Sequence, residues 1–378
     1  MIIGYLLQVN IYIFLGLLLF FFYIISLLFF IFGIFRISNK SKKTDIINNI
    51  SIIVCVKNGE YSLPNILSDL HQQSYPGNLE FIIVDDESTD QTKNIIYQFS
   101  NVDTRFKYFN TNSSTSQLKH KKRALELGIN QSKYNWLLYT DVDCRVKNTW
   151  ALEMSKNFGT SDYVIGLSEV KEENSLVSKF QSIDFRMLMI SACSSVFMNY
   201  PLACTGQNQS YKKDIFNSIS GYTKISGLLQ GDDSIFLQIC RKYKKIKVSF
   251  SVNKESFVRA KTHNKWKDFI IQRIRWAGDA NIMWKYNMYF YFIILSTFLS
   301  NLFIITLIFN NNYYLAILLL SVKFIFENFI YTYGSKKMKI QTNQISFILW
   351  FFIQIPYIVF MGVASFFVNN ILWKGQRA

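Results

Sequence analysis

Apolar residues in the middle of the chain fall into two alternating patterns, short continuous runs and helical stripes. Between the first two runs, apolar residues recur at i, i+3, i+4 and i+7, a spacing that predicts a helix. Strands that alternate with helices predict an α/β domain with a mostly parallel sheet. The stripe consists of Leu63, Ile66, Leu67 and Leu70, and the runs that we interpret as buried strands are Ile50 to Val56, Phe81 to Val84, Phe106 to Phe109, Trp136 to Thr140 and Tyr163 to Leu167.

Polar residues mark the starts of the predicted helices. Ser62 is placed to cap the first helix, with Pro64 in its first turn. Ser88 and Gln91 form a capping-box pattern in front of the second helix. A basic helix is predicted from Lys119 to Ile129.

Four longer segments are apolar enough to span a membrane, which takes about 20 residues. They are Ile11 to Phe35, Met288 to Phe309, Tyr313 to Tyr333 and Ile345 to Val368. A cleaved signal peptide would have a basic start and a shorter apolar core, so we interpret the first segment as a retained anchor. Pro356 and Gly362 leave open whether the last segment is re-entrant. Met187 to Phe197 is apolar but too short to span.

These patterns predict four consecutive parts. They are an N-terminal transmembrane anchor at residues 1–36, an α/β domain at 45–253, an amphipathic interfacial segment at 254–286 and a C-terminal transmembrane region at 287–373.

The placement of positive charge predicts the orientation of the chain. The formal net charge is +16, from 41 Lys and Arg against 25 Asp and Glu. Basic residues cluster directly beside the apolar segments, which is typical of the cytoplasmic side of a membrane. We therefore expect an integral protein of the cytoplasmic (inner) membrane with its α/β domain in the cytoplasm, bound to membrane lipids rather than to nucleic acid. Five cysteines without a CxxC pair and three histidines indicate neither a disulfide framework nor a zinc site.

The fourth run ends in Asp141 and Asp143. Ligands of open α/β sheets bind beyond the carboxyl ends of the strands. In extended backbone, residues i and i+2 point to the same side, so both carboxylates could face one cation. Two hard oxygen donors suit Mg²⁺ or Mn²⁺ held jointly with substrate phosphates. The alternative is a strand that ends in a polar, helix-capping loop.

Two further acidic pairs precede predicted helices, Asp85 with Asp86 and Asp232 with Asp233. Each pair taken alone favours helix capping. Lys121 and Lys122 could contact a phosphate or form a solvated face.

Near the second apolar segment, Gln272, Arg275 and Trp276 stand at i, i+3 and i+4, so one helix face carries all three. Arg273 lies off that face and is expected to face lipid or solvent.

Taken in order, these motifs resemble the membrane-bound family 2 glycosyltransferases, which include cellulose and hyaluronan synthases and ceramide glucosyltransferase. The family pattern is an Asp after an early strand, an Asp-x-Asp, a later acidic-Asp pair and Gln-x-x-Arg-Trp. Residues 84–90, 140–143, 231–233 and 272–276 match it in the same order.

The resemblance implies a glycosyltransferase A-type fold at 45–253, with a Rossmann-like mixed sheet, and inverting, metal-dependent transfer of a hexose. The donor would be a nucleotide-diphosphate sugar, with a UDP-sugar favoured, and the acceptor a lipid or a glycan. The implied roles are base binding by Asp85 or Asp86, donor contact by Glu60 and Lys121, metal binding by Asp141 and Asp143, general base catalysis by Asp233 with support from Asp232, and closure over donor and acceptor by Gln272, Arg275 and Trp276.

The chain departs from the family pattern in three places. Its early loop reads Lys-Asn-Gly-Glu at residues 57–60, so Glu60 keeps only one acidic position. The late pair is Gly-Asp-Asp rather than Thr-Glu-Asp. The membrane part is smaller than polymer-threading synthases need, which favours single transfers.

Two other classes are compatible with parts of the pattern. Aspartate-nucleophile (HAD-like) phosphatases also place Asp-x-Asp after an apolar strand, but on their first strand. A non-catalytic membrane transporter or scaffold would carry intramembrane charge, and here Lys323 and Glu327 lie one helical turn apart.

Overall fold

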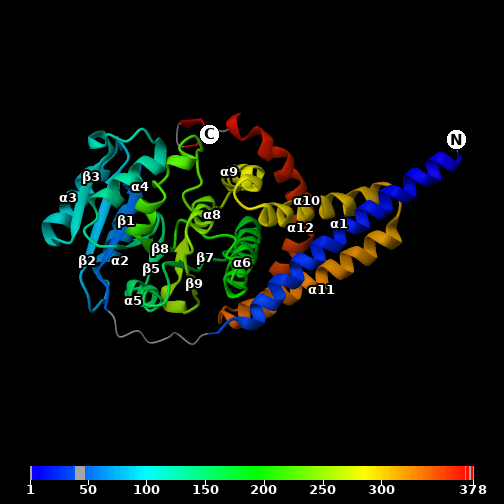
Figure 1. Ribbon diagram of the computed structural model, residues 1–378, viewed down its shortest axis with the longest axis horizontal. Coiled ribbons are helices and arrows are strands. Elements are labelled where there is room, and N and C mark those ends of the chain that lie inside the picture. Colours follow the sequence, from blue (N-terminus) through cyan, green and yellow to red (C-terminus); the bar gives the residue numbers. More distant parts are fainter. Residues whose placement is uncertain (1, 39–46, 371, 374–375, 378) are drawn as a thin grey trace. The chain divides into compact units, whose positions relative to one another are not determined.

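The computed structural model describes residues 2–38, 47–370, 372–373 and 376–377 (Figure 1). The chain divides into two compact units. One unit, here called the sheet unit, comprises Ile37–Lys171 and Asn199–Thr262. The other, here called the helical unit, comprises Met1–Arg36, Glu172–Met198 and His263–Ala378. Neither unit is continuous in sequence, because the chain leaves the sheet unit after Lys171 and returns to it at Asn199.

A seven-stranded mixed sheet forms the centre of the sheet unit, in the order β3-β2-β1-β4-β8-β6-β9. The first four strands in that order are parallel, which confirms the predicted alternation of strand and helix. β8 then runs antiparallel to both of its neighbours, and β9 runs parallel to β6. Strands β1 and β2 are buried almost throughout, which explains their continuous runs of Ile and Val. The strands are β1 (Ile50–Val56), β2 (Leu79–Asp85), β3 (Phe106–Asn110), β4 (Trp136–Tyr139), β6 (Tyr163–Gly166), β8 (Gln209–Lys212) and β9 (Val248–Ser251).

Helices α2 and α3 cover one face of the parallel half, and α4 covers the other (Figure 1). Right-handed crossovers require this arrangement, because the chain moves outward from β1 to β3 and then back across to β4. A smaller sheet has the order β5-β10-β7. Its strands are β5 (Arg145–Val146), β7 (Ser168–Val170) and β10 (Val258–Ala260). The helices of this unit are α2 (Leu63–His71), α3 (Thr92–Val102), α4 (His120–Gln131), α5 (Trp150–Ser155), α7 (Lys213–Ser218) and α8 (Ser234–Tyr243), with short 3₁₀ turns at Thr111–Ser113, Thr223–Ile225 and Lys254–Ser256.

The predicted capping of α3 by Ser88 and Gln91 is wrong. The Ser88 hydroxyl accepts a hydrogen bond from the Asn58 amide at 2.8 Å, in the loop after β1. Asp90 serves the helix start instead, because its Oδ1 accepts from the Thr92 amide at 3.0 Å. Ser62 does precede α2, but its side chain makes no capping hydrogen bond there.

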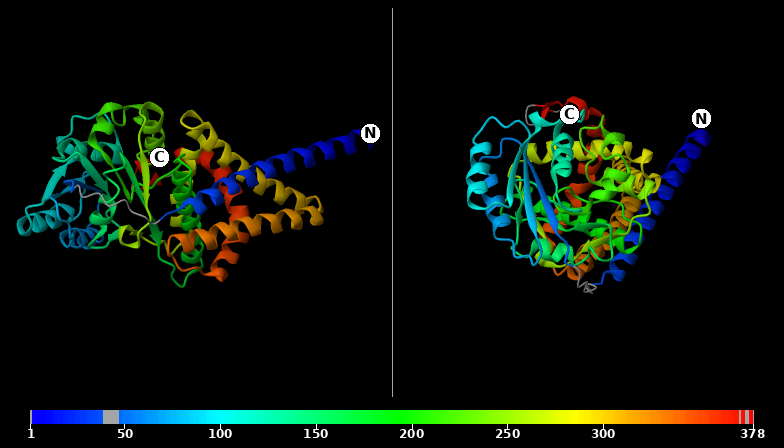
Figure 2. Two further views of the ribbon diagram at one scale, coloured as in Figure 1. Left: turned by 60° about the horizontal axis from the view of Figure 1, so that its bottom comes forward. Right: turned by 60° about the vertical axis from the view of Figure 1, so that its left-hand side comes forward.

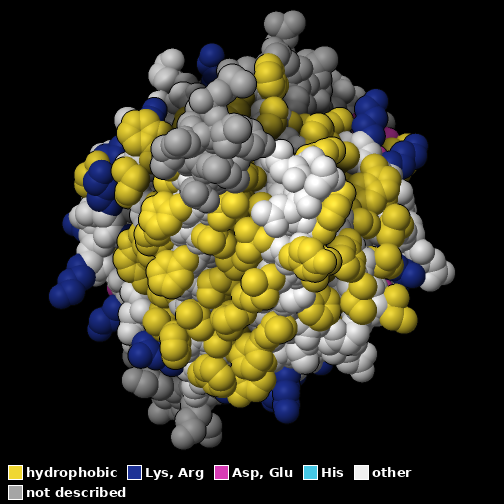
Figure 3. Space-filling model, turned by 90° about the vertical axis from the view of Figure 1, so that its right-hand side faces the viewer, with side chains coloured by type: hydrophobic (Ala, Val, Ile, Leu, Met, Phe, Trp, Pro, Cys, Tyr) yellow, Lys and Arg dark blue, Asp and Glu magenta, His cyan; other side chains and the backbone are white. Residues whose placement is uncertain are grey.

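The helical unit contains all four predicted spans. Four of its helices are long and apolar enough to cross a membrane, over Ile11–Arg36, Met288–Phe309, Tyr313–Lys337 and Gln344–Phe367. Within the unit, α1 lies beside α6, α10 and α11 (Figure 2). Hydrophobic side chains cover most of the face shown in Figure 3. The helices are α1 (Ile2–Arg36), α6 (Leu176–Phe197), α9 (Trp266–Ile282), α10 (Met288–Phe309), α11 (Tyr313–Lys337) and α12 (Gln344–Ala364), with 3₁₀ turns at Met283–Lys285 and Ser365–Asn370 and the short strands β11 (Leu372–Trp373) and β12 (Gln376–Arg377).

Helix α6 extends the short apolar segment predicted at residues 187–197 toward the N-terminus by more than two turns. It packs closely against α1. A Cβ atom added to Gly33 of α1 would lie only 2.3 Å from the backbone oxygen of Ser194 of α6. Small residues at helix contacts allow such close approach of two backbones. The last span is one helix that continues through Pro356.

The charged pair in the third span is buried within the helical unit. Lys323 Nζ lies 2.5 Å from Glu327 Oε1, and the Tyr23 hydroxyl donates to the same oxygen at 2.5 Å. The amide of Gln354 donates to Glu327 Oε2 at 3.0 Å. These contacts connect α1, α11 and α12. The two buried charges therefore pair with each other and with polar groups of neighbouring helices.

Candidate active site

The carboxyl ends of β1 and β2 carry two loops that are hydrogen-bonded to each other. The Asn58 side chain accepts from the Thr89 amide at 2.9 Å, and Gly59 donates its amide to the Thr92 hydroxyl at 2.9 Å. Glu60 joins the same contact, because its Oε2 accepts from the Gln91 amide at 3.2 Å. Glu60 therefore braces the loop after β2, which fixes the acidic residues at the end of that strand.

Asp85 and Asp86 end β2 with different sets of partners. Asp85 is 1% exposed, and both of its oxygens accept hydrogen bonds, Oδ1 from the Ser88 amide at 2.9 Å and Oδ2 from the Tyr108 hydroxyl at 3.1 Å. Asp86 accepts from Thr111 at 3.1 Å and from Arg123 at 3.0 Å, in both cases through Oδ1. Asp85 is thus fully engaged in holding β2 and β3 together, whereas Asp86 binds its partners through one oxygen.

The predicted Asp-x-Asp motif lies in a turn rather than on a strand. β4 ends at Tyr139, and the Cys144 amide donates to the Asp141 carbonyl at 3.1 Å to close the turn. Asp141 is half-buried and Asp143 is exposed. The argument from i, i+2 spacing in extended backbone is therefore wrong, although both carboxylates still lie in one short turn at the predicted edge of the sheet.

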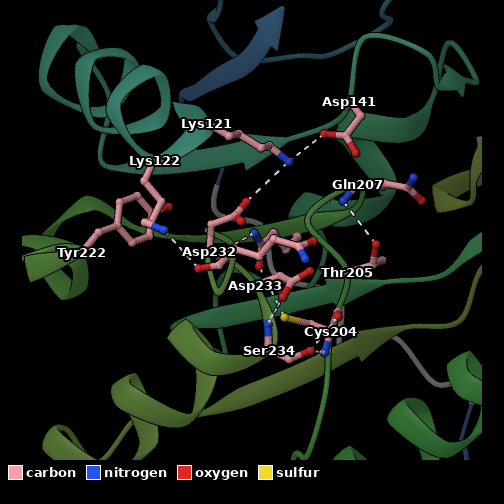
Figure 4. A network of polar contacts seen from close by, with 12 residues as sticks. Lys121, Lys122, Asp141, Cys204, Thr205, Gln207, Tyr222, Asp232, Asp233 and Ser234 are labelled. Carbon is pink, nitrogen blue, oxygen red and sulfur yellow. Dashed lines mark hydrogen bonds and ion pairs between the residues drawn. The ribbon is translucent and has the colours of Figure 1, made fainter. Parts of the chain in front are cut away.

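Lys121 connects two of the predicted site residues (Figure 4). Its Nζ lies 2.9 Å from Asp141 Oδ1 and 3.4 Å from Asp232 Oδ2. Burial opposes the charge of Lys121, but the two carboxylates outweigh it and raise the pKa of its ammonium group above the usual value. The structure thus brings together Lys121 from the start of α4, Asp141 from the turn after β4, and Asp232 from the turn before α8.

Asp233 begins α8 and caps it, since its Oδ1 accepts from the Ser234 amide. The backbone of Gly231 has a φ of +100°, which favours glycine directly before the acidic pair. Burial and the neighbouring charge of Asp232 raise the pKa of Asp233 to about 6. The capping role predicted for this pair is therefore present, and it coexists with a pKa that suits a general base near neutral pH.

Lys122 is a buried residue whose contacts the sequence analysis missed. It is 1% exposed, so it is not part of a solvated face. Its Nζ donates to the carbonyls of Leu228 and, at 3.1 Å, of Gln230. Lys122, Leu125 and Ile129 stand at i, i+3 and i+7 and belong to the buried stripe of α4. This helical spacing was the signal in the sequence that could have predicted the burial of Lys122.

Residues 51–220 match the family model for glycosyl transferase family 2. The chain carries a glycosyltransferase family 2 domain. The chain is 26% identical over 179 residues to a poly-beta-1,6-N-acetyl-D-glucosamine synthase of Staphylococcus epidermidis, covering 46% of this chain and 38% of that protein. It is 30% identical over 115 residues to a 4,4'-diaponeurosporenoate glycosyltransferase of Staphylococcus haemolyticus, covering 30% of this chain and 29% of that protein. The match thus spans well under half the length of either relative.

Among solved structures, the chain resembles a mannosyltransferase from Pyrobaculum calidifontis in complex with GDP-Man and Mn²⁺. The TM-score is 0.61, and the likeness covers 93% of this chain and 97% of that chain. The sequences are 12% identical, so this likeness concerns the fold. Together with the family match it confirms the predicted glycosyltransferase A-type fold.

The Gln-x-x-Arg-Trp motif of the chain lies in the helical unit, in α9. This helix confirms the predicted helical spacing of the segment, and Gln272, Arg275 and Trp276 are each half-buried. The expectation that Arg273 faces lipid or solvent is wrong. Arg273 is 4% exposed, and its Nη2 lies 3.0 Å from Asp184 Oδ2 on α6.

Proposed function

We propose that this glycosyltransferase transfers a hexose from a nucleotide-diphosphate sugar to a lipid or glycan acceptor, with inversion and without processive elongation. The observation that carries the proposal is the cluster of Lys121, Asp141 and Asp232 beside Asp233, with Asp141 in the turn directly after the parallel strand β4. This cluster combines the Lys121 cation, which could bind a diphosphate, with the Asp141 carboxylate, which could bind a metal ion. It also contains Asp233, a carboxylate of raised pKa.

Asp141 and Asp143 are the residues that would hold a divalent ion. No group of three or more metal-binding side chains occurs in the part of the chain that the structure describes. Two carboxylates in one turn nevertheless fit Mg²⁺ or Mn²⁺, which bind through one or two carboxylates together with substrate phosphates. When bound, the ion would stabilise negative charge on the departing diphosphate. The P. calidifontis mannosyltransferase was solved with Mn²⁺, which supports this assignment.

The donor would be held by Lys121 at the start of α4 and by acidic residues in the loops after β1 and β2. Lys121 supplies a protonated ammonium group that can bind a diphosphate oxygen. Asp86 is better placed than Asp85 to accept a hydrogen bond from the base or ribose, because its protein partners use only Oδ1. Glu60 supports this site by fixing the loop after β2. A UDP-sugar is the favoured donor, and GDP-Man is the alternative that the fold neighbour brings forward.

Asp233 would accept the proton of the acceptor hydroxyl as it attacks the anomeric carbon. A positioned base of this kind contributes on the order of 10²–10⁴ in rate. One base is enough for a single in-line displacement, which inverts the anomeric configuration. Asp232 would support Asp233, because its negative charge raises the pKa of that carboxyl.

Gln272, Arg275 and Trp276 are proposed to act on donor and acceptor from α9. Arg275 can offer two parallel hydrogen bonds to a diphosphate, and an indole ring forms a flat wall against a sugar or lipid. The basic residues that flank the spans support a reaction at the cytoplasmic face of the inner membrane. An acceptor in or near the lipid phase would fit this location.

A donor screen with the full-length protein in detergent tests the proposal. The protein is incubated with UDP-, GDP- and dTDP-sugars, a total bacterial lipid extract and Mn²⁺, and nucleotide release and labelled products are measured. We expect one nucleotide to be preferred and a single sugar to be added per product, with an inverted anomeric centre. No turnover of any nucleotide sugar would overturn the proposed transferase, and long polymers would overturn only the non-processive assignment. Release of phosphate from a colorimetric phosphatase substrate would favour the phosphatase alternative, which the family match does not support.

A further inference from the structure

The guanidinium group of Arg273 lies between α6 and α9 of the helical unit. Its Nη2 is 3.0 Å from Asp184 Oδ2. Its central carbon lies 4.0 Å from the centre of the Trp276 ring, a cation–π distance. Arg273 and Trp276 are one helical turn apart on α9, so the same turn carries the buried charge and the indole.

Trp276 also touches α6 directly. Its ring centre lies 5.8 Å from that of Phe185, the residue next to Asp184. The α6 segment therefore contacts the indole twice, once by an aromatic ring and once through the ion pair of Asp184 with Arg273. The indole is therefore tied to α6 by two separate contacts.

Aromatic side chains pack around the ion pair. The ring centre of Phe269, which is itself fully buried, lies 4.9 Å from the Arg273 guanidinium. Nε and Nη1 of Arg273 have no hydrogen-bond partner among the described residues. Burial raises the pKa of the Asp184 carboxyl, and Arg273 only partly opposes this shift.

An ion pair in such surroundings is a poor way to stabilise a helix contact. Well-packed apolar residues of similar size often stabilise a protein as well or better, because the pair must be removed from water. A role in specifying one arrangement of side chains explains the pair better than a role in stability.

We propose that Asp184 and Arg273 are positioning residues that hold the Trp276 ring in the orientation needed for the acceptor. This inference rests on the proposed function, which places Trp276 beside the acceptor. Neither residue touches the substrate in this arrangement. Asp184 orients the guanidinium group, and the guanidinium group orients the indole.

The test compares removal of the pair with removal of one partner. Arg273→Met leaves Asp184 buried and unpaired, so it should lower both the unfolding temperature and transfer. The double variant Asp184→Leu with Arg273→Met removes both charges and should regain an unfolding temperature near that of the wild type. Arg273→Lys keeps the charge but not the planar group and should rescue transfer only in part. Arg186→Met is the matched control, since Arg186 is also on α6 and lies over a different ring, that of Tyr331, at 5.6 Å.

Two readouts separate positioning from stability. The first is the ratio of sugar transferred to a total bacterial lipid extract to sugar lost to water, measured with the preferred donor. We expect this ratio to fall by on the order of 10-fold in the double variant, while donor hydrolysis stays within about twofold of wild type. The second is the ¹⁹F resonance of Trp276 in 5-fluorotryptophan-labelled protein, assigned with Trp276→Phe, which should shift or broaden in the double variant and not in Arg186→Met.

Each contrary result has a distinct meaning. A double variant with a wild-type transfer ratio and an unchanged Trp276 resonance would show that the pair is structural only, and the inference fails. A Trp276→Ala variant with a wild-type transfer ratio would remove the role of Trp276 in the acceptor site, and the inference fails with it. A wild-type protein that neither transfers nor hydrolyses any sugar would overturn the proposed function itself, while the resonance of Trp276 would still report on its orientation.

Discussion

The ammonium group of Lys121 lies 2.9 Å from Oδ1 of Asp141, a carboxylate proposed to bind a metal ion. When the donor and its metal ion bind, Asp141 would give up Lys121 for the metal ion. Lys121 would give up Asp141 for a diphosphate oxygen. The pair would thus couple the proposed metal and diphosphate subsites through one contact. Lys121 also reaches Asp232 at 3.4 Å, so the same ammonium group extends this coupling toward the proposed base.

The first prediction concerns metal binding. Asp141→Asn and Asp143→Asn each remove one anionic ligand, so each should lower kcat/KM for the donor by on the order of 10² or more. EDTA should abolish wild-type activity, and Mn²⁺ or Mg²⁺ should restore it. Asp162→Asn is the control, because Asp162 forms an ion pair with Lys212 at 2.7 Å elsewhere in the sheet unit. Undiminished transfer in excess chelator would rule out the metal assignment.

The second prediction concerns the pH dependence of transfer. Because the pKa of Asp233 is raised to about 6, the carboxylate form is lost as pH falls through that value. The rate should therefore decline about tenfold per pH unit below about 6, the behaviour of a single essential base. Asp233→Asn should keep donor affinity but lower transfer by on the order of 10² or more. Transfer near the wild-type level in this variant would leave Asp233 as a helix cap alone.

The raised pKa of Asp233 has a second consequence, for stability. A carboxyl that binds its proton more tightly in the folded state stabilises the fold at low pH, and this contribution is lost as pH rises from 3.8 to about 6. Asp233→Asn should therefore raise the unfolding temperature more at about pH 8 than at about pH 4. Asparagine can still accept the hydrogen bond from the Ser234 amide, so loss of the cap should not obscure the comparison.

The third prediction concerns Lys122. Lys122→Met removes the donor for the carbonyls of Leu228 and Gln230, and an unsatisfied buried polar group costs about 1–3 kcal/mol. We expect a lower unfolding temperature and a lower kcat, because the released loop leads directly to Asp232 and Asp233. Lys119→Met is the control, since Lys119 is exposed at the start of the same helix. Equal behaviour of the two variants would show that the buried lysine does not hold the acidic loop.

The fourth prediction concerns topology. A cysteine at Asn310, in the exposed turn after α10, should react with an impermeant thiol reagent added outside the cell. A cysteine at Lys336, exposed at the end of α11, should react only after the membrane is opened. The native cysteines give little background, because four of the five are buried and Cys55 is half-buried. The reverse pattern of labelling would place the glycosyltransferase domain outside the cytoplasm. The last residue, Ala378, lies outside the described part of the chain.

Local patterns were enough to predict the parallel half of the sheet and the four spans. The run Ile50 to Val56 became β1 with the predicted bounds, because continuous Ile and Val suit a strand buried on both faces. The family resemblance, and not strand order, implied that Lys121, Asp141 and Asp232 share one site, because only Asp141 directly follows a strand.

What escaped the sequence analysis depends on partners far along the chain. Arg273 looks like a surface residue among lysines until Asp184 of α6 is placed beside it. Lys122 looks solvated until the carbonyls of Leu228 and Gln230 surround its ammonium group. Asp141 looks like the end of a strand, but the turn closed by Cys144 depends on backbone hydrogen bonding that residue types do not specify.

The chain leaves the sheet unit to form α6 and then returns to it. This order affects how the protein folds during synthesis and how it can be divided into fragments. β8 sits in the middle of the large sheet, yet it leaves the ribosome only after α6. Until then β4 is an open edge, and unpaired edges of this kind promote aggregation. A fragment cut at residues 45–253 would keep α6 without α1, α11 and α12, the helices it packs against. Insertion of this chain into lipid and completion of its sheet are therefore expected to be one assembly process, and deleting the spans should yield aggregates rather than a soluble enzyme.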